Sequence, residues 1–343
     1  STRIDIDLGA ILHNAKVLRA VAGDKHVMAV VKADAYGHGS VPVATHIESA
    51  VDAFAVALIE EAVTLRDADV TKPILVLEGP HCAADLALCV HLNIWPTLHR
   101  ADQLAWCHAL TEKPAQVWLK IDTGMHRLGF QPAQAQSISQ QLKADGIKTV
   151  VAMSHLAAAE TPDSDLSIAQ KTTWDAATTN WEGETSLHNS AATLLATPAR
   201  SVWARIGYAL YGGQIEGHEP NARLKPAMTL ASSVLATRRI AQGDSVGYGG
   251  RWTAGRESVI ATVPVGYGDG YPWAAADGTP VAIGEHLVPL AGRVSMDMIT
   301  IDVTDCGEIS HDMPVTLWGN QPHVDTVARH AGTIGYELMT RLT

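Results

Sequence analysis

The sequence predicts an α/β fold in which an N-terminal (β/α)8 TIM barrel precedes a C-terminal mostly-β domain. Short apolar runs rich in β-branched residues alternate with amphipathic stretches over the first two thirds of the chain. This alternation yields eight strands, and the pattern changes after Gly212-Gly213. Eight strand-helix units favour a closed barrel, because an open doubly wound sheet usually has fewer strands.

The predicted barrel strands are short runs of three to six residues, most of them apolar and rich in β-branched residues. They are Val27–Val31, Ala53–Ala57, Ile74–Leu77, Asn93–Trp95, Gln116–Ile121, Thr149–Met153, Ser186–His188 and Trp203–Ile206. The stretches between them, such as Ile59–Ala68 and Ala133–Ala144, mix polar and apolar residues in the manner of amphipathic helices that cover a sheet.

The second domain is predicted from short strand-like runs separated by Gly, Pro and Asp. These runs are Thr229–Arg238, Ser258–Pro264, Val281–Ile283, Met298–Val303 and Pro314–Leu317. The run Thr2–Asp7 precedes the first barrel helix, so we expect it to pair with the second domain. The expected division is therefore a strand at 1–7, the barrel at 8–220 and the β-rich domain at 221–343.

Composition excludes some classes of function. The chain has 343 residues, with 25 Lys and Arg against 36 Asp and Glu, and a formal net charge of -11. This balance argues against binding to nucleic acids or to anionic membranes. No apolar run approaches the roughly 18 to 20 residues of a membrane span, and the N-terminus lacks the pattern of a signal peptide. We therefore expect a cytoplasmic protein.

Cysteine and histidine spacing predicts neither a disulfide framework nor a metal site. Cys82, Cys89, Cys107 and Cys306 form no CxxC pair, and none of the 16 histidines stands in an HExxH pattern. The cysteines are best interpreted as small buried or neutral thiols.

Lys32 is the first candidate for chemistry. It follows the wholly apolar strand Val27–Val31, and so points toward the C-terminal mouth where barrel enzymes build their sites. A lysine whose surroundings disfavour the ammonium form becomes a nucleophile able to form a Schiff base. Gly37 and Gly39 suit a loop that approaches an anion. On this motif alone, a lysine that only extends its amine into solvent remains an equal alternative.

The sequence Val31-Lys32-Ala33-Asp34-Ala35-Tyr36-Gly37-His38-Gly39 resembles the pyridoxal-phosphate lysine motif of the alanine racemase family. Further motifs of that family follow in order across the whole chain. They are Lys120–Gly129, Ser154-His155, Asn189–Ala192, Arg205–Tyr208 with Tyr211-Gly212, Val246–Gly250, Gly266–Tyr271, Ser295–Asp297 and Gly335–Glu337.

The resemblance implies a racemase that uses pyridoxal 5'-phosphate and two bases, one on each face of the substrate. It implies that Lys32 holds the cofactor and is one base, and that Tyr248 of the partner subunit is the other, in a homodimer with shared sites. His155 and Arg205 correspond to the relay that lowers the pKa of the tyrosine. An arginine at the pyridine nitrogen leaves that nitrogen unprotonated, because Arg has no acceptor and keeps its own proton.

The resemblance also implies roles for the remaining site residues. The residues implied at the cofactor phosphate are Tyr36, Ser190, Gly207, Tyr208 and Tyr336, with Asn189 beside them. Arg127 corresponds to a contact with the cofactor oxygen and the substrate carboxylate, and Met296 to a main-chain contact with that carboxylate. Tyr267 and Tyr336 are expected to narrow the entrance. Lys120 matches a position that is often carbamylated, which would turn a cation facing Arg127 into an anion.

Some positions depart from the commonest family pattern, and alternatives stay open. Ile206 and Tyr208 stand where proline and an aliphatic residue are more usual, Asp34 stands where asparagine is frequent, and Ser295 replaces cysteine or alanine. Interconversion of L- and D-alanine is the main hypothesis. The alternatives are a serine or broad-specificity racemase, and a non-catalytic pyridoxal-phosphate homeostasis protein. A role in supplying D-alanine for peptidoglycan and a catabolic role both remain open.

Overall fold

A computed structural model describes residues 2–215 and 223–342. By internal contacts the chain divides into two compact units. One contains Ile11–Ala35 and Gly39–Leu224, and the other contains Ser1–Ala10, Tyr36–His38 and Lys225–Thr343. The predicted domain boundary at 220 and 221 lies outside the described residues. None of the helices within the described ranges has the length and apolar character needed to cross a membrane.

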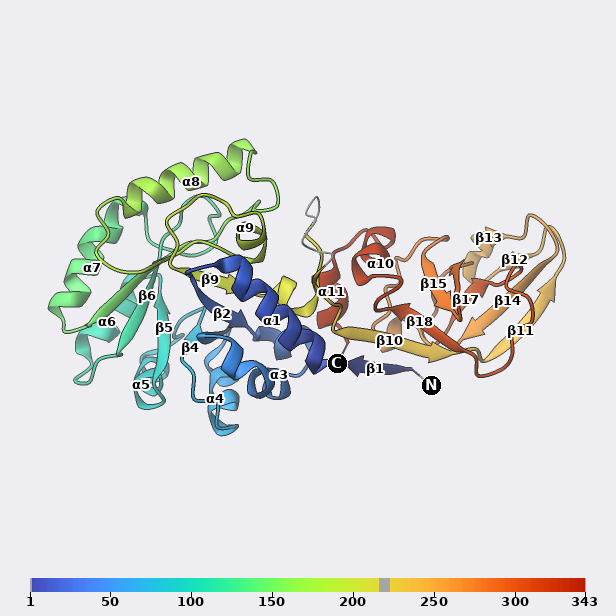
Figure 1. The fold of residues 1–343 in the computed structure, drawn as a ribbon, viewed down its shortest axis with the longest axis horizontal. Helices are drawn as coiled ribbons and strands as arrows, with labels where there is room; N and C mark the ends of the chain where they lie inside the picture. The colour runs from blue at the N-terminus through green and yellow to red at the C-terminus, as the bar shows by residue number, and fades with distance from the viewer. Residues whose placement is uncertain (1, 216–222, 343) are drawn as a thin grey trace. The chain divides into compact units, whose positions relative to one another are not determined.

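The first unit is an eight-stranded parallel barrel, which confirms the predicted fold class (Figure 1). Its strands are β2 (His26–Val30), β3 (Ala53–Val56), β4 (Ile74–Val76), β5 (Ile94–Leu98), β6 (Gln116–Lys120), β7 (Thr149–Met153), β8 (Thr185–Ser186) and β9 (Trp203–Ile206). They are ordered β8-β7-β6-β5-β4-β3-β2-β9, and a parallel bridge between His188 and Ala204 joins the two ends of the sheet.

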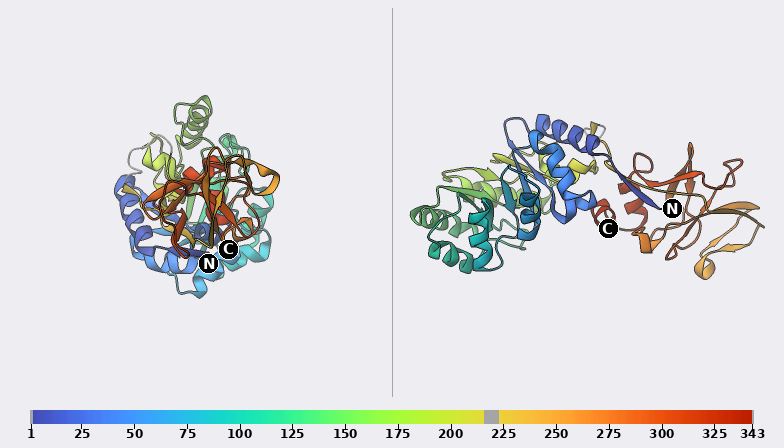
Figure 2. Two further views of the ribbon diagram at one scale, coloured as in Figure 1. Left: turned by 90° about the vertical axis from the view of Figure 1, so that its right-hand side faces the viewer. Right: turned by 90° about the horizontal axis from the view of Figure 1, so that it is seen from below.

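Helices lie outside these strands; Figure 1 labels them, and Figure 2 draws the same ribbon from two further directions. They are α1 (Leu8–Ala22), α2 (Lys32–Gly37), α3 (Ser40–Ile47), α4 (Ile59–Asp67), α5 (Ala83–His91), α6 (Ala101–Ala109), α7 (Ala135–Ala144), α8 (Asp165–Thr178) and α9 (Ser190–Leu194). Helix α4 illustrates their packing, because its buried residues Ile59, Ala62 and Leu65 recur every three positions on one face. The amphipathic pattern thus turns this face toward the sheet.

The barrel interior is a packed core. The strands β3 and β9 are buried along their whole lengths. The ring of Trp203 on β9 lies 5.6 Å from that of Trp118 and 5.8 Å from that of Trp95, measured between ring centroids. Indoles that fill the lumen leave the loops at the C-terminal ends of the strands as the place for a site.

The second unit is mostly β. One sheet has the order β1 (Arg3–Ile6), β10 (Met228–Ser233), β18 (Pro314–Trp318), β15 (Pro280–Ile283) and β16 (His286–Pro289). A second sheet contains β11 (Ala236–Ile240), β14 (Ser258–Val263) and β17 (Ile299–Asp302), and β12 (Ser245–Val246) pairs with β13 (Trp252–Thr253). Two helices, α10 (Val324–His330) and α11 (Gly335–Thr340), complete the unit.

Two features of this unit can be compared with the strands predicted from the sequence. The N-terminal strand β1 pairs antiparallel with β10, so that Ile4 lies opposite Leu230. The run Thr229–Arg238, expected as one strand, is two strands in different sheets. The apolar residues Val234 and Leu235 continue the strand pattern, and only the change of pairing partner separates β10 from β11.

Candidate active site

Lys32 stands immediately beyond β2 and Val31, at the C-terminal mouth of the barrel. It begins α2, a short turn in which Ala33, Asp34, Ala35 and Tyr36 all have φ between 51° and 54°. This turn is therefore left-handed. Burial, followed by the charge of Arg127, lowers the pKa of the Lys32 amine, while Glu61 and Glu78 act in the opposite direction. The amine consequently loses its proton more readily than an exposed lysine does.

Four basic side chains gather around the mouth. Lys120 ends β6, Arg127 lies in the loop that follows it, and Arg205 lies on β9. Burial and the charges of Arg205 and Arg127 hold the pKa of Lys120 well below its usual range. Together with Lys32, these side chains form an electropositive centre in a chain whose net charge is -11. The centre is suited to an anionic ligand.

Arg205 is 5% exposed and its guanidinium is held by the ends of two neighbouring strands. One terminal nitrogen donates to the carbonyl of Ser186 at 3.0 Å, and the other donates to the carbonyl of Ser154 at 2.7 Å. The second nitrogen also lies 3.2 Å from Nδ1 of His155. Burial lowers the pKa of Arg205 to about 10, so it remains a cation at neutral pH.

His155 follows β7 and is neutral at neutral pH. Burial, followed by the charges of Arg205 and Lys120, holds its pKa well below the usual range. Its main chain is fixed by Gln170 of α8, whose Nε2 donates to the carbonyl of His155 at 3.1 Å. Gln170 is 1% exposed, and the sequence reading did not single it out.

Arg127 is presented by a loop that Asp122 organises. The Asp122 carboxylate accepts hydrogen bonds from the main-chain nitrogens of Gly124 and His126, each at 3.0 Å. Gly129 has φ +130°, and a Cβ there would lie 2.6 Å from the nitrogen of Asp122. The Arg127 side chain is exposed and makes no hydrogen bond or ion pair among residues 2–215 and 223–342. It is therefore available to a ligand.

The residues expected at the phosphate occur in both units. Within the barrel, Ser190 Oγ accepts from the nitrogen of Gly207 at 3.1 Å, and Asn189 caps α9 through the nitrogen of Ala192. Tyr208 is 3% exposed, and a Cβ on Gly213 would lie 2.3 Å from its ring. In the other unit, the rings of Tyr36 and Tyr336 lie 6.1 Å apart, and burial raises the pKa of Tyr36 to about 12.

The remaining predicted residues lie in the β-rich unit. Tyr267 and Met296 come together because the nitrogen of Gly268 donates to the carbonyl of Met296 at 2.9 Å. A Cβ on Gly266 would lie 2.3 Å from that carbonyl, so glycine is required there. Tyr248, Tyr267 and Met296 are 71%, 40% and 55% exposed, which is high for large apolar side chains.

An ion pair supports the loop that carries Tyr248. Arg251 Nε and Nη2 each lie 3.1 Å from a carboxylate oxygen of Asp277. Arg251 also donates to the carbonyl of Gly292 at 3.1 Å, and Asp277 accepts from the nitrogen of Gly292. Neither Arg251 nor Asp277 was predicted, because nothing in their sequence spacing indicates this pairing.

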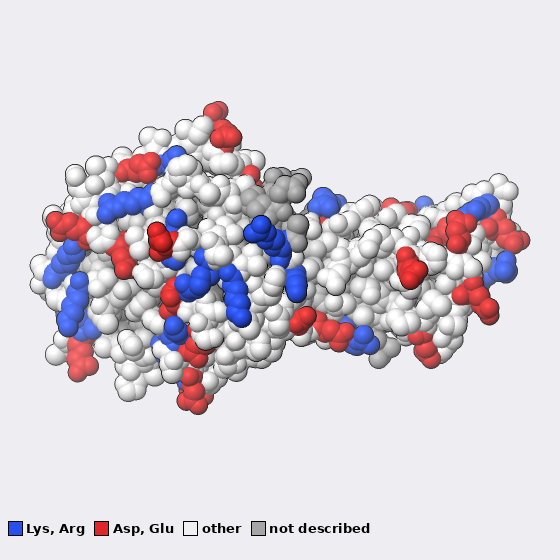
Figure 3. Space-filling view, in the orientation of Figure 1, with Lys and Arg blue, Asp and Glu red and all other residues white. Residues whose placement is uncertain are grey.

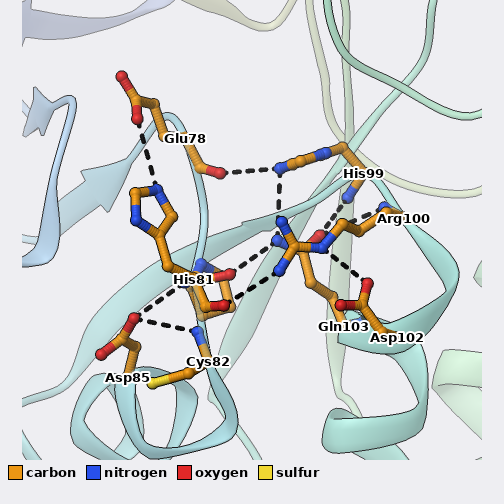
Figure 4. A network of polar contacts seen from close by, with 9 residues as sticks. Glu78, His81, Cys82, Asp85, His99, Arg100, Asp102 and Gln103 are labelled. Carbon is orange, nitrogen blue, oxygen red and sulfur yellow. Dashed lines mark hydrogen bonds and ion pairs between the residues drawn. The ribbon is translucent and has the colours of Figure 1, made fainter.

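A polar network orders the loops after β4 and β5 (Figure 4). Buried Gln103 accepts from the nitrogen of His99 at 2.8 Å and donates to the carbonyl of Pro80 at 2.9 Å. His99 Nε2 lies 2.8 Å from the carbonyl of Glu78, and Arg100 donates to the carbonyl of His81. The network positions Glu78, one of the two carboxylates that act on Lys32.

Basic and acidic side chains are interspersed on the face shown in Figure 3. Within the described ranges, no cluster of three or more His, Cys, Asp or Glu side chains has the arrangement of a metal site.

Comparison with known families matches nearly the whole chain. Residues 6–215 match the family model "Alanine racemase, N-terminal domain", and residues 227–343 match "Alanine racemase, C-terminal domain". A protein named alanine racemase from Alteromonas mediterranea is 42% identical over 344 residues, which cover all of this chain and 96% of that protein.

Solved structures agree with the family models. The structure of the biosynthetic alanine racemase from Pseudomonas aeruginosa has a TM-score of 0.95 and 40% identity, and the match covers 100% of this chain and 97% of that one. The alanine racemase from Bartonella henselae, described with covalently bound pyridoxal phosphate, has a TM-score of 0.89 and 29% identity over 100% and 97% of the chains. The chain therefore belongs to the alanine racemase family.

Proposed function

We propose that this protein is an isomerase that interconverts L- and D-alanine with pyridoxal 5'-phosphate as its cofactor. One observation carries the proposal: a lysine with a lowered pKa stands beside two arginines at the barrel mouth of a chain that matches both alanine racemase domains. The match of the second domain argues against a non-catalytic homeostasis protein, which has the barrel and the lysine without that domain.

The residues at the mouth fit this cofactor chemically. Lys32 supplies a nucleophilic amine for the aldehyde. The Ser190 hydroxyl, which accepts from the nitrogen of Gly207, has its own proton to donate to a phosphate, and the basic side chains at the mouth favour a negative charge. Gly207 and Tyr208 are proposed to lie beside this phosphate. Tyr36, Tyr336 and Asn189 are proposed to complete the phosphate site. When bound, pyridoxal phosphate supplies the electron sink that acidifies the α-proton of an amino acid.

Two groups are proposed to move the α-proton. The Lys32 nitrogen takes or returns it on one face of the substrate, and the phenolic oxygen of Tyr248 does so on the other. Two bases are needed because inversion requires removal of the proton from one face and its return to the opposite face.

Arg205 and His155 are proposed to set the electrostatics. Arg205 keeps its proton, so toward the pyridine nitrogen of a bound cofactor it could only donate a hydrogen bond. The neutral imidazole of His155 lies between this cation and the tyrosine in the proposed relay.

Substrate binding is proposed to depend on contacts with the carboxylate of the amino acid. The exposed guanidinium of Arg127 is suited to a bidentate contact with it, and the main chain of Met296 supplies a further contact. Tyr267 narrows the entrance. Carbamylation of Lys120 would place an anion beside Arg127 and orient the Arg127 guanidinium group.

We infer that two copies share their active sites. The exposure of Tyr248, Tyr267 and Met296 supports this inference, because a second copy would cover these apolar side chains. The proposed partners are thus alanine and a second subunit. The cytoplasmic location stays a prediction.

The proposal is tested by cofactor attachment and by face-specific proton exchange. The purified protein should absorb visible light, and borohydride reduction should attach the cofactor to the peptide that contains Lys32. Tyr248→Phe should abolish α-proton exchange with D2O for one alanine enantiomer far more than for the other, with Tyr271→Phe as a matched control. Absence of the cofactor from Lys32 would refute the function, and equal loss for both enantiomers would refute the role of Tyr248.

The same preparation resolves the alternative substrates. Initial racemisation rates for alanine, serine and longer amino acids should be highest for alanine. A higher kcat/KM for serine would favour the serine or broad-specificity alternative.

A further inference from the structure

The turn that carries Lys32 is conformationally costly. Ala33, Asp34, Ala35 and Tyr36 are four consecutive non-glycine residues with φ between 51° and 54°. Each such residue is disfavoured because its Cβ approaches the following carbonyl oxygen. A turn of this kind persists only where surrounding contacts hold it in place.

Glu61, in the first turn of α4, makes such a contact. Its Oε1 accepts a hydrogen bond from the nitrogen of Ala33 at 2.7 Å. Its Oε2 accepts from the nitrogens of Ala57 and Leu58 at 2.7 and 2.9 Å. The bonds to Ala57 and Leu58 belong to the start of α4, whereas the bond to Ala33 crosses to the neighbouring strand-helix loop.

This carboxylate thus ties two adjacent loops together. Ala33 directly follows Lys32, and Ala57 directly follows β3, which pairs with β2. Hydrogen bonds to an ionised carboxylate are shorter and stronger than those between neutral groups. Glu61 is therefore placed to fix the position at which the main chain leaves β2 for the left-handed turn.

Glu61 also acts on Lys32 through charge. Its carboxylate raises the pKa of the Lys32 amine, and so opposes the lowering by burial and by Arg127. The geometric effect and the electrostatic effect are separable, because an amide removes the charge and a shorter carboxylate retains it.

We propose that Glu61 is a positioning residue for Lys32: its carboxylate anchors the left-handed turn to the end of β3 and sets where the Lys32 amine stands. The inference deepens the proposed function, since it rests on Lys32 as the cofactor-binding lysine. It assigns no contact between Glu61 and the substrate.

The test compares Glu61→Gln with the matched control Glu60→Gln. Glu60 is the preceding residue of the same helix, is exposed, and has no side-chain hydrogen bond or ion pair within the described part of the chain. In Glu61→Gln, an amide NH2, which cannot accept, replaces one of the two acceptor oxygens. Either the hydrogen bond from the nitrogen of Ala33 or those from the nitrogens of Ala57 and Leu58 are therefore lost. Apoprotein of each variant is mixed with pyridoxal phosphate, reduced with borohydride at intervals, and digested to quantify labelled Lys32.

Glu61→Gln should slow cofactor capture at Lys32 roughly tenfold and lower kcat for alanine by a similar factor, with KM within about twofold. The pH at which capture reaches half its maximal rate should move downward, because loss of the carboxylate lowers the pKa of Lys32 further. Glu60→Gln should match the parent protein in all four measurements.

Glu61→Asp is the second variant, and it tests the positioning role of Glu61 if Glu61→Gln does not fold. It keeps the charge but is one methylene shorter, so it cannot reach all three nitrogens. Slower capture with an unchanged pH midpoint would support positioning. Capture and kcat equal to those of the parent in Glu61→Asp, or in a folded Glu61→Gln, would overturn the inference. If the parent protein itself fails to capture the cofactor at Lys32, the proposed function fails instead.

Discussion

Arg205 donates a hydrogen bond from Nη2 to Nδ1 of His155 across 3.2 Å. A guanidinium has only donors, so Nδ1 must be the unprotonated nitrogen of the ring. His155 is neutral because burial and the neighbouring cations hold its pKa well below the usual range. The ring proton therefore resides on Nε2, and the imidazole presents a single donor on the side away from Arg205.

Arg205→Lys tests this arrangement. The ammonium group of lysine cannot reach the carbonyls of Ser154 and Ser186 and also Nδ1 of His155. Some of these buried acceptors therefore lose their hydrogen-bond donor. We expect the free energy of unfolding to fall by about 1–3 kcal/mol and kcat to fall at least about tenfold. Urea unfolding and steady-state racemisation measure the two effects.

The control for this change is Arg200→Lys. Arg200 also donates to two main-chain carbonyls, those of Thr178 and Trp181. We expect Arg200→Lys to lower the free energy of unfolding with little change in kcat. A parallel loss of kcat in both variants would contradict a specific role for Arg205.

Lys120 should be carbamylated. A carbamate forms when a neutral amine attacks carbon dioxide and releases a proton, and the pKa of Lys120 is held well below its usual range by burial and by Arg205. Protein equilibrated with 13C-bicarbonate should show a carbamate carbon resonance that is lost in Lys120→Met. Lys113→Met is the control and should retain it. Absence of the resonance from the parent protein would exclude the modification under those conditions.

Mixed subunits should recover activity that neither parent variant has. We expect the Lys32→Ala and Tyr248→Phe homodimers each to be inactive. Heterodimers purified from co-expressed, differently tagged copies should show about half of the parent activity per dimer, and an unsorted mixture about a quarter. Recovery follows because one of the two shared sites then contains both bases. Purified heterodimers without activity would contradict shared sites.

Acid should destabilise the barrel through His188. This residue is 3% exposed, its Nε2 lies 2.9 Å from the carbonyl of Thr197, and burial lowers its pKa from 6.5 to about 4. The unfolded chain takes up a proton below pH 6.5 while the native histidine does not. The contribution of the neutral histidine to the free energy of unfolding is therefore complete above pH 6.5. It is lost as pH falls toward 4, where the free energy of unfolding should be lower by about 3 kcal/mol.

His188→Gln should flatten this part of the profile, because glutamine does not titrate. Urea unfolding between pH 7 and pH 4 measures the slope, and His91→Gln on the exposed surface of α5 is the control. Equal slopes in the parent and in His188→Gln would show that another group causes the loss.

Most of the barrel strands were predictable because parallel strands buried on both faces are largely apolar. The prediction was least accurate at β8, Thr185–Ser186, which is polar and shares only Ser186 with the predicted run Ser186–His188. The pattern failed at Thr229–Arg238, where Val234 and Leu235 carry the same signal through a change of sheet. Motif resemblance identified Lys32 and Arg205 but missed Glu61 and Gln170. These two act through hydrogen bonds to loops 28 and 15 residues away in sequence, and no local pattern indicates such a bond.

The sequence by itself determined the fold class, the family and the identities of the reactive groups, because strand periodicity and motif residues are local properties of the chain. The tertiary structure decided which of these groups act on one another. Arg205 and His155 are 50 residues apart in sequence but 3.2 Å apart in space, and the left-handed turn after Lys32 contains no glycine before Gly37. Charge interactions and desolvation depend on distance and burial, and folding alone sets both.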